Sequence, residues 1–227
     1  MIAILTAMPE EAAPFLAALT DPQPLTDSPV SAVAGKLSRR EACVITTGIG
    51  TARASLAATW AALTLRPNAI ISAGSCGGLG KEVQVGDVVI GESYAYSVAD
   101  ATAFGYAPGQ VPGAPERFAS PAELVRAAKT AQAGGAPAHA GLMLSGDAFV
   151  TAPLAGRVRE TFPGALSADM ESTAIMHVAH SLNIPAIAVR AVSDLCDPDA
   201  GQRFHIGLEE AAKNSFEAVT SLVNSAF

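Results

Sequence analysis

The chain has 227 residues, of which 50% are hydrophobic and only 15% charged, and its formal net charge at pH 7 is −7. This composition excludes a disordered chain, and the length is ample for one domain with a large core. Nucleic-acid-binding proteins meet phosphates with clusters of Lys and Arg, which this acidic chain lacks, so we expect no nucleic-acid partner.

Short apolar segments typical of strands alternate with helical segments along the chain. The first strand is expected at residues 2–6, and a helix follows at Pro9, with acidic residues in its first turn where the helix dipole favours them. Further strands are predicted at residues 42–47, 69–73, 87–90, 141–144, 165–170 and 186–192. Further helices are predicted at residues 51–63, 121–131, 153–160, 171–182 and 208–223. Because the strands are apolar on both faces and helices separate them, we predict an α/β fold: a three-layer α/β/α sandwich over residues 1–227, with a mainly parallel or mixed central sheet.

Nothing in the sequence indicates export or a membrane. The first residues carry no basic segment and reach Glu10 and Glu11 at once, unlike a signal peptide, and no apolar run approaches the roughly 18 residues of a membrane helix. Cys43, Cys76 and Cys196 are odd in number and form no CxxC pair, which indicates reduced thiols and not a disulfide or zinc framework. We therefore expect a cytoplasmic protein that has no membrane partner.

Residues 92–120 interrupt the alternation of strands and helices. This segment holds all three tyrosines of the chain among several prolines and glycines. A loop of this length in a compact domain usually serves as a lid or an interface, although it can also simply pack on its own domain. The apolar composition of the chain also indicates that some surface is covered by a second copy.

Two glycine-rich turns follow predicted strands. Gly48-Ile49-Gly50-Thr51-Ala52-Arg53 has an arginine in place of the third glycine of a dinucleotide-binding turn, and no acidic residue lies between positions 41 and 82 to hold a cofactor ribose. Gly74-Ser75-Cys76-Gly77-Gly78 does not match the GxSxG nucleophile motif, and Cys76 has no evident histidine partner. We therefore expect no cofactor, although the backbone amides of these turns and the Ser75 hydroxyl can hold a water, a phosphate or a sugar oxygen.

No metal site is expected from the histidines and aspartates. His177 and His180 lie three residues apart on a predicted helix and face core positions, without further ligands in register. Asp194, Asp197 and Asp199 lack the glycine and the final glutamate of a calcium-binding loop.

Carboxylates stand at the ends of three predicted strands, as Glu11, Glu171 and Asp194. The carboxyl ends of parallel strands meet at one edge of a sheet, where open α/β folds bind ligands, so these acids are expected to converge. Such convergence costs repulsion and desolvation unless function uses it; the alternative is that each acid only caps a helix. Without a metal, three acids suit cleavage of a glycosidic bond: one protonates the leaving group, one activates water and one holds sugar hydroxyls. The residues alone leave open whether an O- or an N-glycoside is cut.

Eight short motifs follow one another over nearly the whole chain. They are Ala7-Met8-Pro9-Glu10-Glu11, Gly48-Ile49-Gly50, Ala73-Gly74-Ser75-Cys76-Gly77-Gly78, Val85-Gly86-Asp87, Asp100-Ala101-Thr102-Ala103-Phe104-Gly105-Tyr106, Ser145-Gly146-Asp147-Ala148-Phe149, Asp169-Met170-Glu171-Ser172-Thr173-Ala174 and Arg190-Ala191-Val192-Ser193-Asp194. In this order they resemble the 5′-methylthioadenosine/S-adenosylhomocysteine nucleosidases of the nucleoside phosphorylase superfamily. One such motif would be a weak signal, whereas eight in order are specific.

The resemblance implies a hydrolase that releases adenine from the thioether nucleosides left by S-adenosylmethionine chemistry. It implies that Asp194 protonates adenine at N7, that Glu11 activates water, and that Glu171 holds the ribose hydroxyls. The supporting residues that it implies are Ser193 to orient the acid, Ser75 at the water, Met170 under the sugar, Phe149 and the Val150 backbone at adenine, and Met8, Ile49 and Phe204 at the 5′-thio group. It further implies a homodimer in which Ala101, Phe104 and Pro112 of one subunit complete the 5′-thio pocket of the other.

Three departures from the family pattern leave the proposed acids in place. Pro9 replaces an acid at the start of the first helix, Asp169 replaces a longer Glu beside Met170, and Ser97-Val98 replaces His-Asp in the partner loop. These changes leave open which 5′ substituents are accepted, and related adenine nucleosides such as 5′-deoxyadenosine or aminofutalosine stay open as additional substrates.

Two other functions also stay open. A phosphorylase of the same fold would use phosphate as its nucleophile and would need arginines around it; such enzymes typically carry a Gly-Asp-Pro turn with a following Arg after the first strand, where this chain has Met8-Pro9-Glu10-Glu11. A non-catalytic nucleoside-binding protein would be expected to lose at least one of the three acids, and all three are present here.

Overall fold

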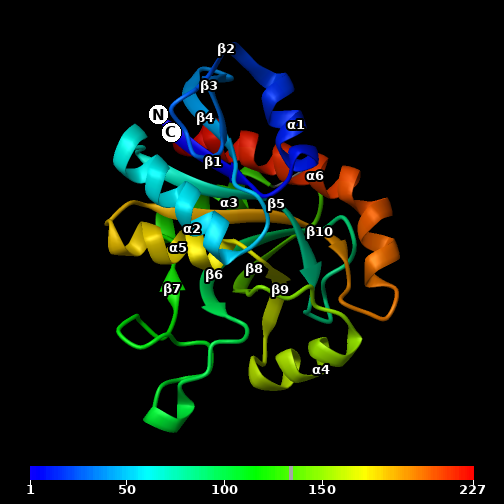
Figure 1. Cartoon of the computed structure of the whole chain (residues 1–227). Coiled ribbons are helices and arrows are strands. Elements are labelled where there is room, and N and C mark those ends of the chain that lie inside the picture. The colour runs from blue at the N-terminus through cyan, green and yellow to red at the C-terminus, as the bar shows by residue number, and fades with distance from the viewer. Residues whose placement is uncertain (133–134) are drawn as a thin grey trace.

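A mixed sheet of ten strands lies between layers of helices in the computed structural model, which describes residues 1–132 and 135–227 (Figure 1). The strands are β1 (Ile2–Thr6), β2 (Leu19–Pro24), β3 (Ser31–Leu37), β4 (Arg40–Thr46), β5 (Ala69–Gly78), β6 (Val88–Tyr96), β7 (Phe118–Ala119), β8 (Ala138–Ser145), β9 (Ala165–Asp169) and β10 (Ala186–Asp194). The helices are α1 (Pro9–Ala18), α2 (Thr51–Trp60), α3 (Ala122–Ala131), α4 (Ala152–Thr161), α5 (Ser172–Ser181) and α6 (Ala200–Ala226), with a π-helical turn η1 (Ala61–Leu65) and a 3₁₀ turn η2 (Thr102–Phe104).

The strand pairing confirms the predicted α/β fold, and it also shows that part of the sheet closes on itself. The strand order is β10-β6-β8-β9-β5-β1-β4-β3-β2, and β10 also pairs with β5, so the five strands from β10 to β5 close on one another. β1 is parallel to β4 and β5, and β5 is parallel to β10, so the carboxyl ends of these central strands share one edge. The antiparallel pairs include β3 with β4 and β10 with β6, which makes the sheet mixed.

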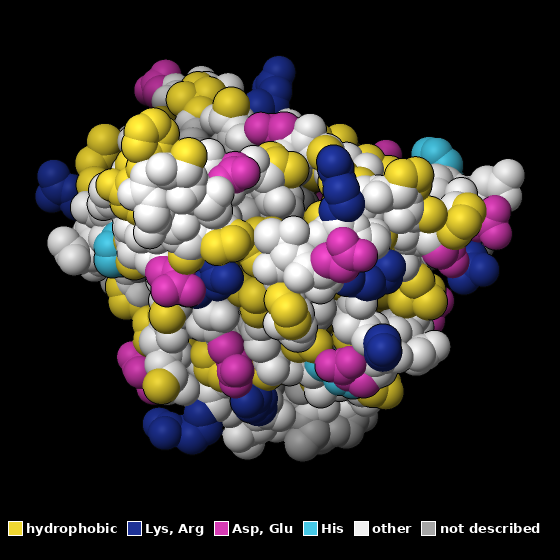
Figure 2. Space-filling model, turned by 90° about the horizontal axis from the view of Figure 1, so that it is seen from below, with side chains coloured by type: hydrophobic (Ala, Val, Ile, Leu, Met, Phe, Trp, Pro, Cys, Tyr) yellow, Lys and Arg dark blue, Asp and Glu magenta, His cyan; other side chains and the backbone are white. Residues whose placement is uncertain are grey.

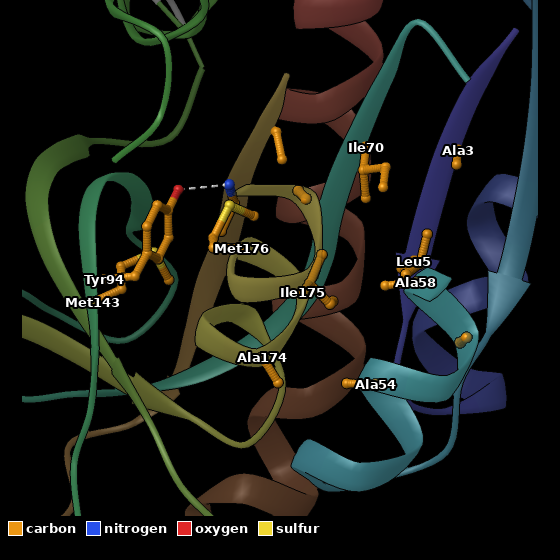
Figure 3. Close-up of a cluster of buried hydrophobic side chains, with 14 of the residues drawn as sticks. Ala3, Leu5, Ala54, Ala58, Ile70, Tyr94, Met143, Ala174, Ile175 and Met176 are labelled. Carbon is orange, nitrogen blue, oxygen red and sulfur yellow. Dashed lines mark hydrogen bonds between the residues drawn. The ribbon is translucent and has the colours of Figure 1, made fainter. Parts of the chain in front are cut away.

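Helices cover both faces of the sheet and bury two large apolar clusters. α1, α3 and α6 pack on one face, over a cluster that includes Phe15 and Val219, whereas α2 and α5 pack side by side on the other. Figure 3 shows Ala54 of α2 and Ala174 of α5 pointing into the space between these two helices. Such small side chains let the helix backbones approach closely, so α2 and α5 form a compact layer over β1 and β5. None of the helices in the described residues has the length and apolar character needed to cross a membrane.

Part of the predicted 92–120 loop is regular structure. β6 continues to Tyr96 and pairs with β7, so both ends of the segment belong to the sheet. Tyr94, expected in the loop, is fully buried; its hydroxyl donates to the Gly91 carbonyl and accepts the Ala188 amide, each at 2.8 Å (Figure 3). The aromatic side chain therefore fills the core and bridges β6 to β10, and the irregular part of the segment is confined to residues 97–117.

Two further differences have local causes. The hairpin of β2 and β3 was not predicted, because its exposed edge strand β2 carries the polar sequence Leu-Thr-Asp-Pro-Gln-Pro and lacks an apolar pattern on both faces. α6 begins at Ala200, eight residues before the predicted start at residue 208. Gly207 permits this longer helix, because a Cβ at that position would lie 2.5 Å from the Ser193 carbonyl oxygen of β10. The first turns of α6 thereby reach the end of β10, where the site described next lies.

Candidate active site

A cavity of about 460 Å³ opens at the carboxyl ends of β1, β5, β9 and β10. The three predicted acids, Glu11, Glu171 and Asp194, all line it, and each is at most 3% exposed. Other predicted residues on its wall are Met8, Ile49, Ser75, Phe149, Val150, Met170, Ser193 and Phe204. Ala101, Phe104 and Pro112 do not line this cavity; they belong to residues 97–117, where Phe104 is 83% exposed.

The acids converge for a reason that differs in part from the prediction. β1, β5 and β10 are parallel, as expected, and bring Glu11 and Asp194 to one edge. β9 instead runs antiparallel to β5, with Gly77 opposite Ala168, so its carboxyl end meets the end of β5 from the opposite direction. The expectation that Glu171 reaches the cavity at the end of a parallel neighbour is therefore wrong, although the side chain does reach it.

Glu11 is held by four hydrogen-bond donors. Its Oε2 accepts the backbone amides of Ala7 (2.8 Å) and Met8 (3.1 Å), and its Oε1 accepts the amide and the hydroxyl of Ser75, both at 2.8 Å. Gly74 makes room for it: its φ is +128°, and a Cβ there would lie 2.5 Å from the Glu11 carboxyl carbon. Gly74 and Ser75 lie within β5, which continues to Gly78, so the prediction of a turn directly after residue 73 is wrong. The strand itself fixes this carboxylate and leaves it little freedom to rotate.

Glu171 lies against a buried guanidinium. Arg190, in the middle of β10, is 1% exposed; its Nη1 is 3.2 Å from Glu171 Oε2, and its Nε is 3.3 Å from Asp169 Oδ2. The other oxygen of Glu171 accepts the Gly50 amide at 2.9 Å. Burial raises the pKa of Glu171 to about 7, against the opposing effects of the Arg190 charge and the Gly50 amide.

Asp194 occupies a different environment, away from that cation. The Ser193 hydroxyl donates to its Oδ2 and the Cys196 amide to its Oδ1, each at 3.0 Å. Cys196 itself adopts a left-handed φ of +54°. Burial raises the pKa of Asp194 above the usual value of an aspartate, more than these two hydrogen bonds lower it.

The far wall of the cavity is apolar. Phe149 packs edge-to-face on Phe204 of α6, with ring centroids 5.7 Å apart, and Met8, Ile49 and Met170 also line it. Asp169 is a fourth carboxylate on the cavity wall, and the apolar part of the wall suits a flat, uncharged group. The described residues contain no cluster of His, Cys, Asp and Glu side chains that would hold a metal ion.

The sequence and the fold match known proteins over their whole lengths. The sequence model of the phosphorylase superfamily matches residues 1–224. The structure of the 5′-methylthioadenosine/S-adenosylhomocysteine nucleosidase of Neisseria meningitidis, in complex with methylthio-immucillin-A, superposes with a TM-score of 0.96 at 38% identity and covers 99% of this chain and 98% of that chain. The nucleosidase of Colwellia psychrerythraea, bound to adenine, superposes with a TM-score of 0.96 at 30% identity and covers 99% of this chain and 94% of that chain. The nucleosidase of Streptococcus pneumoniae, bound to 8-aminoadenine, superposes with a TM-score of 0.95 at 31% identity and covers 99% of each chain.

This chain belongs to the 5′-methylthioadenosine/S-adenosylhomocysteine nucleosidase family of the phosphorylase superfamily. The family resemblance drawn from the eight motifs is thereby confirmed.

In this nucleosidase family member, sequence reasoning assigned no role to Arg190, although the structure places it at the centre of the site. Besides the two acids, Arg190 donates to the Ser72 hydroxyl and, at 2.9 Å, to the Ser75 carbonyl. Asp169 in turn accepts the amides of Glu171 and Ser172, both at 3.0 Å. The available signal was a lone arginine inside a strand that is otherwise apolar, because a charge buried in a sheet requires partners.

We predict that replacing Arg190 by Met destabilises the protein strongly. Arg190→Met leaves Asp169 and Glu171 buried without their cation, and breaking a buried ion pair from one side costs about 3–5 kcal/mol. The free energy of unfolding, measured by urea denaturation, should fall by that amount. The matched change Arg157→Met, on the exposed face of α4, should alter it by no more than about 0.5 kcal/mol. Equal effects of the two changes would show that the buried ion pair adds nothing to stability.

Proposed function

We propose that this protein hydrolyses the N-glycosidic bond of 5′-methylthioadenosine and S-adenosylhomocysteine, releasing adenine and the 5′-thioribose. The observation that carries the proposal is the set of three carboxylates, Glu11, Glu171 and Asp194, held by different partners around one cavity. The relatives whose structures contain adenine or methylthio-immucillin-A support the same substrate class.

Asp194 is the proposed general acid. Adenine leaves poorly as an anion, and protonation at N7 removes the negative charge that develops as the bond breaks; such acid catalysis typically contributes about 10² to 10⁴ in rate. An aspartate serves only if it keeps its proton toward neutral pH, and burial raises the pKa of Asp194 in this direction. Ser193, bonded to Oδ2, holds the carboxyl group in one orientation.

Glu11 is the proposed base, and Glu171 the proposed ribose ligand. The four donors around Glu11 fix its carboxylate beside Ser75, so that both side chains can hold and activate a water for attack on the sugar. Glu171 keeps one lone pair on each oxygen after binding Gly50 and Arg190, which suits it to accept hydrogen bonds from ribose hydroxyls.

The apolar wall supplies the rest of the pocket. Phe149, Val150 and Met170 all line the cavity. We propose that Phe149 stacks on adenine, that the Val150 backbone contacts the base edge, and that Met170 lies under the sugar. Met8, Ile49 and Phe204 are proposed to surround the 5′-thio group.

The charges of the cavity favour water over phosphate as the nucleophile. The carboxylates of Glu11 and Asp169 would repel a phosphate dianion, and Arg190 is already engaged by Asp169 and Glu171. A phosphorylase would need cationic side chains available to the anion. Hydrolysis is therefore the reaction that this arrangement supports best.

We also propose a homodimer in which residues 92–120 of one subunit complete the site of the other. Phe104 projects from η2 with 83% of its surface exposed, and Ile49, Leu56 and Leu63 are each at least half exposed on and beside α2. Figure 2 looks onto the lower face, where the η2 loop lies in Figure 1, and shows hydrophobic side chains gathered in patches between the charged ones. Large exposed apolar side chains of this kind usually mark a protein interface.

The reduced, buried cysteines support a cytoplasmic location.

The decisive measurement is adenine release from 5′-methylthioadenosine in phosphate-free buffer, followed by identification of the sugar. We expect free 5-methylthioribose and a rate that added phosphate does not raise. Strict dependence on phosphate, with a sugar 1-phosphate as product, would establish a phosphorylase and remove the role proposed for Glu11. Failure to release adenine in either buffer would point to a different nucleoside substrate or to a nucleoside-binding protein.

Asp194→Asn should lower kcat/KM for adenine release by about 10² to 10⁴ while the protein stays folded, because Asn keeps an acceptor for the Cys196 amide but has no acidic proton. In the wild type, Asp194 is protonated at pH values below its raised pKa and loses this proton above it. The value of kcat/KM should therefore fall about tenfold per pH unit on the alkaline side. The variant should lose this alkaline decline. Asp27→Asn, at an exposed turn, provides the control with wild-type rate and pH profile.

For the dimer, Phe104→Ser should raise the dissociation constant by about 30-fold, because truncation of a central aromatic anchor typically costs about 2 kcal/mol. Sedimentation at several concentrations measures this constant, and KM for 5′-methylthioadenosine should rise with it. Val85→Ser removes an exposed apolar side chain elsewhere and should change neither value. A wild-type protein that sediments as a monomer at every concentration would contradict the proposal.

A further inference from the structure

Asp147, from one of the family motifs, and Thr51, the residue after the Gly48-Ile49-Gly50 motif, have no part in the proposed chemistry, although they connect two segments that line the cavity. Asp147 lies two residues before Phe149, and Thr51 begins α2 directly after the turn that holds Glu171. The Asp147 carboxylate accepts the Thr51 amide at 2.7 Å and the Thr51 hydroxyl at 2.5 Å. Because Gly50, the residue before α2, has no side chain with which to cap the helix, a residue 96 positions away supplies the cap.

The turn before α2 is shaped to receive two carboxylates at once. Gly50 has a φ of +104°, and a Cβ at this position would lie 2.9 Å from Asp147 Oδ1. Its amide donates to Glu171 Oε1, whereas the next amide, of Thr51, donates to Asp147. Consecutive backbone amides therefore tie the ribose side of the cavity to the adenine side, and the positive end of the α2 dipole strengthens both contacts.

Asp147 also lies immediately before residues 148–150, which line the cavity. Upstream of it, the Ser145 hydroxyl donates to Asp169 Oδ1 at 2.6 Å, and the Gly146 amide donates to the Asp169 carbonyl at 3.2 Å. Downstream, residues 148–150 line the cavity, and α4 begins only after Thr151. The contact between Asp147 and Thr51 therefore lies between this anchored segment and the cavity-lining residues 148–150.

We propose that Thr51 and Asp147 form a latch, and that this contact holds the adenine-contacting segment, residues 148–150, at a fixed position relative to Glu171. Both are positioning residues, since neither lines the cavity. The inference rests on the proposed function, because it assumes that this segment contacts adenine. The segment would contact adenine in the ground state and in the transition state alike, so loss of the latch should weaken binding more than it slows the chemical step.

The test compares Thr51→Val, Thr51→Ser, Asp147→Ala and the double variant Thr51→Val/Asp147→Ala. We expect Thr51→Val and Asp147→Ala each to raise KM for 5′-methylthioadenosine by about 3- to 30-fold, the range that loss of a helix cap supplies, with kcat within about threefold of wild type. Thr51→Ser retains the hydroxyl and should restore the wild-type KM. In the double variant, the Thr51 change should add almost nothing to the Asp147 change, because the hydroxyl has already lost its acceptor.

Thr130→Val is the matched control, since it removes an exposed helix hydroxyl that donates to the Arg126 carbonyl; its KM should equal that of wild type. Calorimetric titration of adenine into each variant gives a second measure of the same loss, independent of turnover. Unchanged KM and adenine affinity in Thr51→Val and Asp147→Ala, or effects of the two changes that simply add, would overturn the latch while leaving the hydrolase intact. If the wild type neither hydrolyses the nucleoside nor binds adenine, the proposed function and the latch both fail.

Discussion

The buried guanidinium of Arg190 is the interaction on which the rest of the site depends. A charge that is 1% exposed inside a sheet is tolerated only when its donors are paired, and Arg190 pairs with Asp169, Glu171, the Ser72 hydroxyl and the Ser75 carbonyl. This one residue therefore links β10 to β5 and to the start of α5. It also permits two carboxylates to be buried side by side, which their mutual repulsion would otherwise prevent.

The partners of each carboxylate place three acids of similar chemistry in three different environments. Glu11 is surrounded by hydrogen-bond donors, burial and a cation act on Glu171 in opposite directions, and Asp194 is buried with Ser193 and Cys196 as donors. Groups that ionise differently at one pH are what acid–base cleavage requires, since one must give a proton while another accepts one. Three carboxylates in different environments therefore lie within one cavity of about 460 Å³.

The sequence predicted those features that local pattern determines. The alternation of apolar strands and helices was enough for the α/β fold, and the rule that parallel strands end at one edge brought Glu11 and Asp194 together. The contacts of Arg190 were beyond that reasoning, because its partner Ser72 is 118 residues away and no local pattern records such a pairing. For the same reason the extension of β6 was missed: Tyr94 looks like a loop aromatic in sequence, and only its bonds to Gly91 and Ala188 show that it belongs to the core.

The glycine turn at residues 48–50 shows how one backbone feature can serve a different purpose from the one its pattern suggests. In a dinucleotide-binding fold, amides at such a turn receive the phosphates of the cofactor. Here the amides of Gly50 and Thr51 receive Glu171 and Asp147, so the protein's own acids occupy the anion-binding positions. Glu11 makes the same use of the amides of residues 7, 8 and 75. With these donors engaged, the cavity presents acceptors and apolar walls, a surface that matches the hydroxyls of a sugar and the face of a neutral base better than it matches an anion.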